Sequence, residues 1–122
     1  MKLIKRLGLS LLASLLLLAL AACSRQETDN RTLDHFTNAF KEAGLAIEEA
    51  GEPLFSEIGA AAGAAFNIGE ETVKVYMYES EEALEKAQKD YASKLQGFER
   101  NGRFLLETTH EKATEIFKNL ER

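Results

Sequence analysis

The first 22 residues limit which part of this chain can form a folded domain. Three basic residues precede an apolar run from residue 7 to residue 20, and two small residues, Ala21 and Ala22, follow it. This order of positive charge, apolar run and small residues is typical of a secretory signal peptide. The run is shorter than the roughly 20 apolar residues that a membrane-spanning helix needs. We therefore expect residues 1–22 to be a signal peptide and the folded domain to follow it.

The end of this segment, Leu20-Ala21-Ala22-Cys23, is more specific than a general signal peptide. It resembles the lipobox of bacterial lipoproteins, in which a Leu and two small residues precede a Cys. The resemblance implies that the thiol of Cys23 receives a diacylglycerol, that a peptidase cuts before Cys23, and that the new N-terminus is acylated. No other cofactor is expected. Two or more lipid chains bind a membrane more firmly than the marginal attachment that one chain provides.

The same resemblance implies where the protein resides. A lipidated Cys23 anchors the chain to the extracytoplasmic face of a cell membrane. Ser24 follows Cys23, and it is not the Asp that resembles a signal for retention at the inner membrane. In a cell with two membranes we therefore expect the outer membrane. The chain as a whole resembles the small lipoproteins of bacteria, and the resemblance extends to no narrower family.

The 100 residues from Cys23 onward match the size of one domain. Cys23 is the only Cys in the chain, so no internal disulfide can stabilise the fold. Three of the 15 basic residues and none of the 20 acidic residues lie in the signal peptide, so the remainder carries a formal charge of −8. This acidity argues against binding to nucleic acid, which requires basic residues. It also argues against a body lying flat on anionic lipid, although the acidity can equally serve solubility alone.

A polar segment links the anchor to the domain. Residues 24–31 contain no apolar side chain, so we expect residues 23–31 to comprise the lipidated Cys23 and a flexible tether. Eight flexible residues span a root-mean-square distance of roughly 15 Å. The domain, residues 32–122, is therefore expected to stay close to the bilayer.

The first half of the domain contains two helical patterns and two expected strands. Apolar residues recur at helical spacing within residues 32–43, and Gly44 suits the position after a helix. A short strand is expected at 45–48 and a short helix at 52–58. Residues 59–66 are ambiguous, because their alanines suit a helix whereas Gly59 and Gly63 favour a break. We prefer a strand that runs to Ile68 and turns back at 69–71.

The second half contains the clearest strand. Residues 72–78 alternate strictly, and Ser80 then caps a long helix whose apolar stripe is Leu84, Ala87, Tyr91 and Leu95. Residues 96–102 are expected to be a loop with a turn at Asn101-Gly102, followed by a strand at 103–107. Thr108 and Glu111 match a capping box that begins the last helix.

The expected order of elements is therefore α-β-α-β-β-α-β-α. Such an order fits a small α+β domain with about four strands in a mixed or antiparallel sheet and with helices packed mainly on one face.

No pattern of catalytic or metal-binding residues is found. The chain contains no nucleophile elbow, phosphate loop, dinucleotide fingerprint or Cys-x-x-Cys. Its two histidines, His35 and His110, lie near helix starts without metal-ligand spacing. Glu79, Glu81, Glu82 and Glu85 form the densest acidic group, but they lie at a helix start, where negative charge is favourable and solvated. We therefore expect neither enzymatic activity nor a metal site.

One face of the alternating strand is a candidate binding surface. Val73, Val75 and Met77 share one face, so Lys74, Tyr76 and Tyr78 lie on the other. If helices cover the valine face, the tyrosines are exposed, and exposed Tyr is frequent at interfaces. We therefore predict a partner-binding face at Lys74, Tyr76 and Tyr78. The alternative is that a helix covers this face as well.

These features predict a non-enzymatic module that binds an envelope protein or peptide and is attached to the membrane by lipid. The alternative is a lipoprotein that binds a small ligand or an ion and assists transport. A flat face bearing the tyrosines favours the first function, and a large apolar cavity favours the second.

Overall fold

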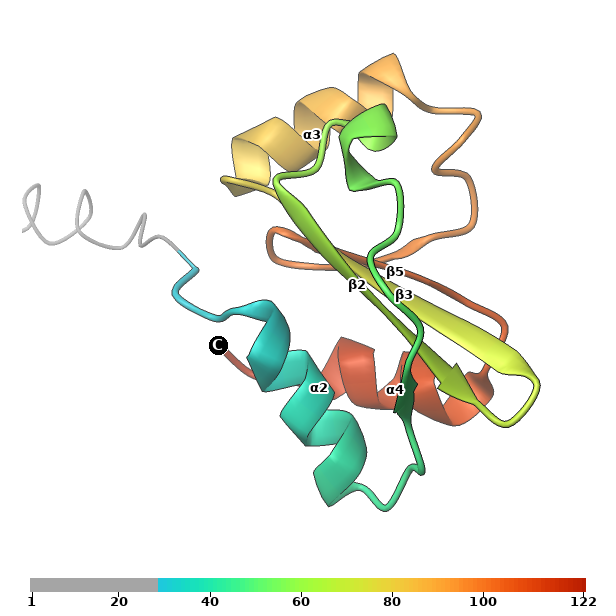
Figure 1. The fold of residues 1–122 in the computed structure, drawn as a ribbon. Coiled ribbons are helices and arrows are strands. Elements are labelled where there is room, and N and C mark those ends of the chain that lie inside the picture. The colour runs from blue at the N-terminus through green and yellow to red at the C-terminus, as the bar shows by residue number, and fades with distance from the viewer. Residues whose placement is uncertain (1–28) are drawn as a thin grey trace, which may run out of the picture.

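A computed structural model describes residues 29–122, which form a sheet with helices above and below it (Figure 1). The predicted signal peptide, the lipidation site Cys23 and residues 24–28 of the predicted tether lie outside the described residues. Within residues 29–122, no helix combines the length and the apolar character needed to span a membrane.

Five strands form one antiparallel sheet. The strands are β1 (Glu48–Glu49), β2 (Ala62–Ile68), β3 (Glu71–Met77), β4 (Glu99–Asn101) and β5 (Phe104–Thr108). The helices are α2 (Leu33–Glu42), α3 (Glu81–Asp90), α4 (Glu111–Asn119) and the short 3-10 helix η1 (Phe55–Ile58). Across the sheet the strands follow the order β1-β2-β3-β5-β4, and every neighbouring pair is antiparallel. The predicted α+β class is confirmed, with an antiparallel sheet.

Helices α2 and α4 cover one face of the sheet. The alternation of β3 directs Val73 and Val75 to this face, where they meet Phe104 and Leu106 of β5. The helices contribute the buried residues Phe36, Phe40, Ala113 and Phe117. The rings of Phe36 and Phe104 lie 4.5 Å apart between their centroids. The helical spacing seen in the sequence thus corresponds to the apolar stripes of α2 and α4.

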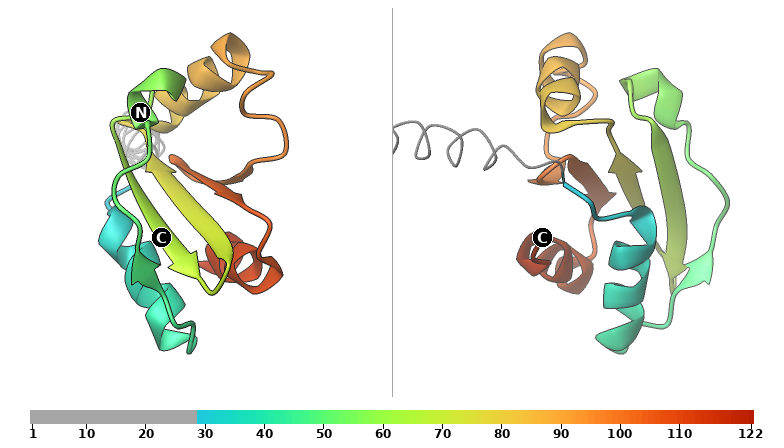
Figure 2. Two further views of the ribbon diagram at one scale, coloured as in Figure 1. Left: turned by 45° about the vertical axis from the view of Figure 1, so that its right-hand side comes forward. Right: turned by 90° about the vertical axis from the view of Figure 1, so that its left-hand side faces the viewer.

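Helix α3 and the short helix η1 cover the other face (Figure 2). There Leu84 and Ala87 of α3 and Ile58 of η1 pack against Leu105 of β5. Helices therefore cover both faces of the sheet, and the prediction that they pack mainly on one face is wrong. The domain has two small cores with the sheet between them, which lets about 94 residues bury apolar side chains on both faces.

Several predicted boundaries are wrong in detail. Residues 99–101, expected to be loop, form the edge strand β4; their side chains are only half-buried, so they show no apolar alternation. Helix α3 ends at Asp90, although Leu95 is buried as the predicted stripe requires. The ambiguous segment 59–66 contributes to strand β2, as we preferred. Thr108 continues strand β5, and His110 caps α4 instead, because its Nδ1 accepts the Ala113 N–H at 3.1 Å.

A group of polar side chains fixes the start of the domain to its C-terminal half. The Arg31 guanidinium donates to both carboxylate oxygens of Asp29, at 2.9 Å and 2.6 Å, and to the Leu120 carbonyl at 2.9 Å. It also donates to the Asn101 side chain at 3.0 Å. Arg103 donates to the backbone carbonyls of Asp29 and Arg31, at 2.9 Å and 2.8 Å. We call Asp29, Arg31, Asn101 and Arg103 the Asp29 cluster.

The Asp29 cluster shows that the predicted tether, residues 23–31, includes residues that belong to the folded domain. Asp29 and Arg31 are only 5% and 4% exposed, so residues 29–31 belong to the folded domain. Their local sequence is polar and resembles a linker. Arg31 binds Asn101 and Leu120, which lie 70 and 89 residues further along the chain, and the Asp29 carbonyl accepts from Arg103, 74 residues further, so no local pattern reveals the burial.

The environment of Asp29 favours its charged form. Burial, the strongest single influence, opposes ionisation, but hydrogen bonds from the Arg31 side chain and backbone and the nearby charges of Arg31 and Arg122 together outweigh it. The pKa of Asp29 is consequently held below its usual value. A carboxylate with a lowered pKa stabilises the fold above the ordinary Asp pKa of about 4, and this contribution is lost as the pH falls through the lowered value.

Gly102 makes the close packing of the Asp29 cluster possible. It lies in the turn between β4 and β5, where the sequence predicted a turn, and its φ is +60°. A Cβ at this position would overlap the carboxylate of Asp29 and the guanidinium of Arg31. Glycine therefore serves both the backbone conformation and the space that the buried ion pair requires.

Candidate functional site

The predicted binding face is not assembled as expected, because α3 and η1 cover much of it. Tyr76 is 5% exposed and Tyr78 is fully buried, so neither tyrosine ring forms an open docking surface. Of the three, only Lys74, in the middle of β3, remains partly exposed. The expected exposure of Tyr76 and Tyr78 is therefore wrong, and the alternative, a helix over this face, is what forms. Alternation shows which side chains share a face but not which helix will cover that face.

Tyr78 has a structural role in the second core. Its hydroxyl donates to the Ile58 carbonyl at 2.7 Å and so links β3 to the end of η1. Burial, with a smaller contribution from the neighbouring Tyr91, raises the pKa of Tyr78 to about 12. A Tyr in the unfolded chain has a pKa near 10. The fold therefore favours the neutral phenol.

Tyr78→Phe should expose this linkage. We expect the free energy of unfolding to fall by about 1 kcal/mol at neutral pH, because one buried hydrogen bond is lost. In the parent protein, stability should also decline as the pH rises from about 10 to about 12, since the unfolded chain releases the Tyr78 proton first. The variant should show a shallower decline. Denaturant titrations at a series of pH values measure both effects, and an identical slope in the two proteins would contradict the assignment.

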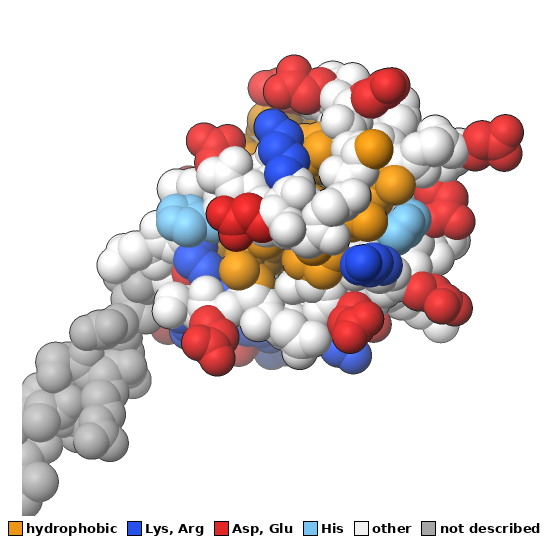
Figure 3. All heavy atoms as spheres, turned by 90° about the horizontal axis from the view of Figure 1, so that it is seen from below, with side chains coloured by type: hydrophobic (Ala, Val, Ile, Leu, Met, Phe, Trp, Pro, Cys, Tyr) orange, Lys and Arg blue, Asp and Glu red, His pale blue; other side chains and the backbone are white. Residues whose placement is uncertain are grey.

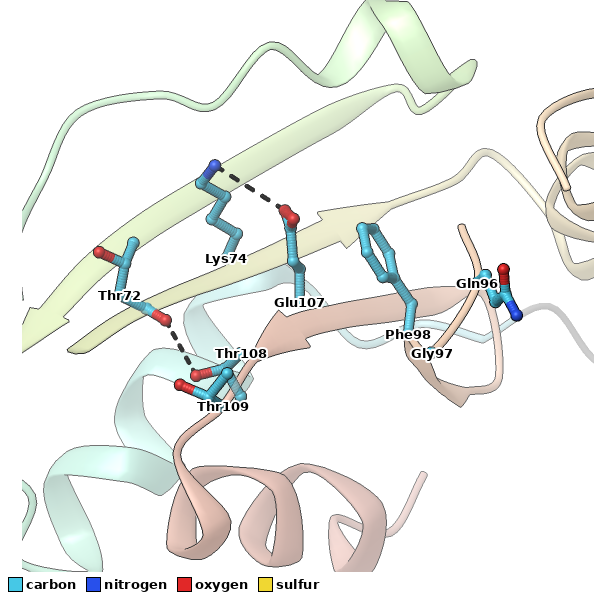
Figure 4. Close-up of a pocket in the computed structure, with 8 residues that line it drawn as sticks. All are labelled: Thr72, Lys74, Gln96, Gly97, Phe98, Glu107, Thr108 and Thr109. Atoms are coloured by element: carbon cyan, nitrogen blue, oxygen red, sulfur yellow. Dashed lines mark hydrogen bonds and ion pairs between the residues drawn. The ribbon is translucent and has the colours of Figure 1, made fainter. Parts of the chain in front are cut away.

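The uncovered part of the same sheet face forms an open hollow of about 320 Å³. It lies where β3 begins and β5 ends, beside the segment that leads into β4 (Figure 4). The lining residues are Thr72, Lys74, Gln96, Gly97, Phe98, Glu107, Thr108 and Thr109, and we call this surface the Lys74 hollow. The hollow exists because α3 and η1 cover only the other end of this face.

A charged pair lies on the floor of the Lys74 hollow. Lys74 and Glu107 are cross-strand partners of β3 and β5, and both side chains are 39% exposed. The Lys74 Nζ lies 3.8 Å from the Glu107 Oε1, which is longer than a hydrogen bond. The same oxygen accepts the Tyr76 hydroxyl at 3.0 Å. Glu107 is therefore held in place, whereas the Lys74 ammonium donates no hydrogen bond to any residue from 29 to 122, so its donors remain available to a ligand.

Tyr76 supports the hollow from below. Burial, followed by the hydrogen bond to Glu107 and the charge of Glu107, raises the pKa of Tyr76 well above its usual value. Its ring stacks on Phe98, with centroids 6.2 Å apart and planes inclined by 7°. The tyrosine thus orients both the carboxylate and the aromatic wall of the hollow, although it does not itself form the surface.

The sequence identified Lys74 but missed Glu107, Phe98, Gln96 and Thr109. Glu107 had one available signal, since it lies in an expected strand at a polar position of the alternation. The register that places it opposite Lys74 depends on how β5 pairs with β3, which the sequence does not specify. The segment 96–98 adopts no regular structure, and only the folded chain brings it to the end of β5.

A second hollow has less varied side chains. A shallow hollow on α4 is lined by Lys112, Glu115, Ile116, Asn119 and Leu120, all from one helix and its end. Seen from below, hydrophobic atoms reach the surface between charged side chains (Figure 3). Within residues 29–122, no group of three or more His, Cys, Asp or Glu side chains is arranged to hold a metal ion. The Lys74 hollow therefore has the most varied chemistry among the described surfaces.

Comparison with protein-family models, with curated proteins and with solved structures found no match to this chain. Its function is therefore argued from its own residues.

Proposed function

We propose that this protein is a lipid-anchored, extracytoplasmic module without enzymatic activity that binds a protein or peptide segment through the Lys74 hollow. The anchor part of the proposal rests on Leu20-Ala21-Ala22-Cys23. The binding part replaces the tyrosine face, which is covered, with the neighbouring open surface. Lys74 belongs to both, and it is the residue on which the proposal depends.

The binding proposal rests on one observation, the distance between the Lys74 ammonium and the Glu107 carboxylate. An ammonium 3.8 Å from a carboxylate that Tyr76 already binds retains its own hydrogen-bonding capacity. An ammonium and a carboxylate side by side can receive a ligand that carries both signs of charge, as polypeptide segments commonly do. Phe98 adds an apolar wall, and Gln96 and Thr109 add exposed polar groups at the rim. The open shape suits a segment of a larger partner more than an enclosed small molecule.

Site-specific photo-crosslinking in living cells tests the binding proposal. Photoreactive residues at Gln96 and Thr109, both exposed at the rim, should attach to the same partner. A photoreactive residue at Glu115, exposed on α4 at the opposite face, is the matched control and should not capture that partner. Lys74→Ala should weaken binding of the purified partner roughly tenfold, as expected for the loss of one charged hydrogen bond. Capture that is equal from all three positions, or binding unchanged by Lys74→Ala, would reject the Lys74 hollow.

The anchor has its own control in the same cells. The parent protein should incorporate labelled fatty acid, and Cys23→Ala should not. Equal labelling of the two proteins would reject lipidation of Cys23 without bearing on the Lys74 hollow.

A further inference from the structure

The chain enters the domain at one defined end of the sheet. Asp29 lies beside Gly102, in the turn between β4 and β5, and Arg31 binds the Leu120 carbonyl just after α4. Arg31 also lies over the rings of Phe36 and Phe104, with its guanidinium carbon 5.2 Å and 5.4 Å from the ring centroids. These contacts fix the point at which the segment leading to Cys23 leaves the domain.

The Lys74 hollow extends from the middle of the sheet to the opposite end. Strand β5 runs from Phe104, near the Asp29 cluster, to Thr108, which lines the hollow. Its partner β3 runs the other way, so Met77 lies near the cluster and Thr72 lines the hollow. From Arg103 to Thr109 the chain covers roughly 20 Å at the rise of a β-strand. Figure 1 shows the N-terminal entry and the β2–β3 turn at opposite ends of the sheet.

The chain between the lipid and the cluster is about as long as the distance of roughly 20 Å from Arg103 to Thr109. Six residue steps separate Cys23 from Asp29, and they can reach at most about 20 Å even when fully extended. To turn the hollow toward the bilayer, the cluster must rise by about the length of the sheet, which uses this entire reach. If the cluster were open, the first fixed residue would be Leu33 at the start of α2, and the reach would grow to about 35 Å.

We propose that the Asp29 cluster is an orienting clamp, which shortens the lipid tether so that the Lys74 hollow faces away from the membrane. This inference rests on the anchor part of the proposed function, since it requires lipidated Cys23. The clamp gives the buried ion pair a role beyond stability, because it determines how much of the chain can act as a tether. A partner then reaches the hollow from the side remote from the lipid.

Fluorescence quenching on vesicles tests the orientation. The lipidated protein carries one introduced thiol, at Glu70→Cys or at Glu121→Cys, and Cys23, the only natural Cys, is blocked by lipid. Both positions are exposed glutamates, the first in the β2–β3 turn near the hollow and the second next to Leu120 at the cluster. A fluorophore at each position is measured on vesicles of phosphatidylethanolamine and phosphatidylglycerol that carry a headgroup-attached quencher. We expect several-fold stronger quenching at position 121 than at position 70, and equal quenching would overturn the proposal.

Two variants separate the clamp from a merely structural effect. Insertion of about twelve Gly and Ser residues between Gln26 and Glu27 leaves the cluster intact but lengthens the tether, so the difference in quenching should disappear. Asp29→Asn should also reduce the difference in quenching between positions 70 and 121. Circular dichroism should confirm that this variant remains folded. If the Asp29→Asn variant does not fold, the insertion alone decides, and an unchanged difference after insertion would overturn the proposal.

The test also distinguishes the clamp from the proposed function. Failure of the parent protein to bind vesicles would overturn the lipid anchor, and the clamp with it. Strong orientation without any captured partner would support the clamp and reject only the Lys74 hollow as a binding site.

Discussion

Arg31→Ala should lower the free energy of unfolding by about 3–5 kcal/mol, the range found when one partner of a buried ion pair is removed. The substitution leaves the Asp29 carboxylate buried without its guanidinium partner, because their side chains are only 1% and 5% exposed. It also removes the donor to the Leu120 carbonyl and the cation above Phe36 and Phe104. Denaturant unfolding followed by circular dichroism measures the loss.

Arg122→Ala is the comparison for this prediction, since the charge of Arg122 is the smallest of the influences that favour the ionised form of Asp29. Arg122 also pairs with a carboxylate, that of Glu81, but these side chains are 51% and 40% exposed. Exposed pairs contribute about 0–1 kcal/mol, so this substitution should change stability by less than about 1 kcal/mol. Similar losses in the two variants would contradict the view that burial of the Asp29–Arg31 pair makes it important.

Leu84→Ala should lower the free energy of unfolding by about 2–5 kcal/mol, because it leaves a cavity between α3 and the sheet. Leu84 is fully buried and packs with Tyr76, Tyr78 and Leu105 in the second core. The substitution cannot act through helix propensity, since Ala favours a helix at least as strongly as Leu does. The effect therefore measures how firmly α3 covers the tyrosine face.

Lys86→Ala on the same helix provides the comparison. Lys86 is exposed, so its replacement should change stability by no more than about 0.5 kcal/mol. If Leu84→Ala were as mild as Lys86→Ala, helix α3 would not seal this face. Such a result would favour the exposure of Tyr76 and Tyr78 that the sequence predicted over their burial beneath α3.

Local patterns were sufficient to predict the helices and the long strands. The alternation of residues 72–78 predicted β3, and the Ser80 side chain does accept the Ala83 N–H at 3.0 Å at the start of α3. Each of these signals acts within one or two helical turns or one strand. Edge strand β4 gave no such signal, since its pairing with β5 places polar residues in a sheet without burying them.

Long-range contacts decided the features that could not be predicted. Whether Tyr78 is exposed depends on Ile58, 20 residues away, and on the position of α3. Glu107 meets Tyr76 across 31 residues, and it is this contact that arranges the floor of the Lys74 hollow. The alternation of residues 72–78 therefore places Lys74 on the right strand and face, but it does not define the surface around Lys74.

The Asp29 cluster also has a consequence for the order in which the domain is completed. The chain is synthesised from its N-terminus, and Arg31 must wait for the Leu120 carbonyl, which lies 89 residues later. Contacts across so long a loop form late, because the entropy of closing the loop is lost before the contact stabilises it. The first residues of the domain to emerge are thus the last to be fixed. Until the C-terminal residues arrive, Asp29 and Arg31 are without the long-range contacts that bury them in the finished domain.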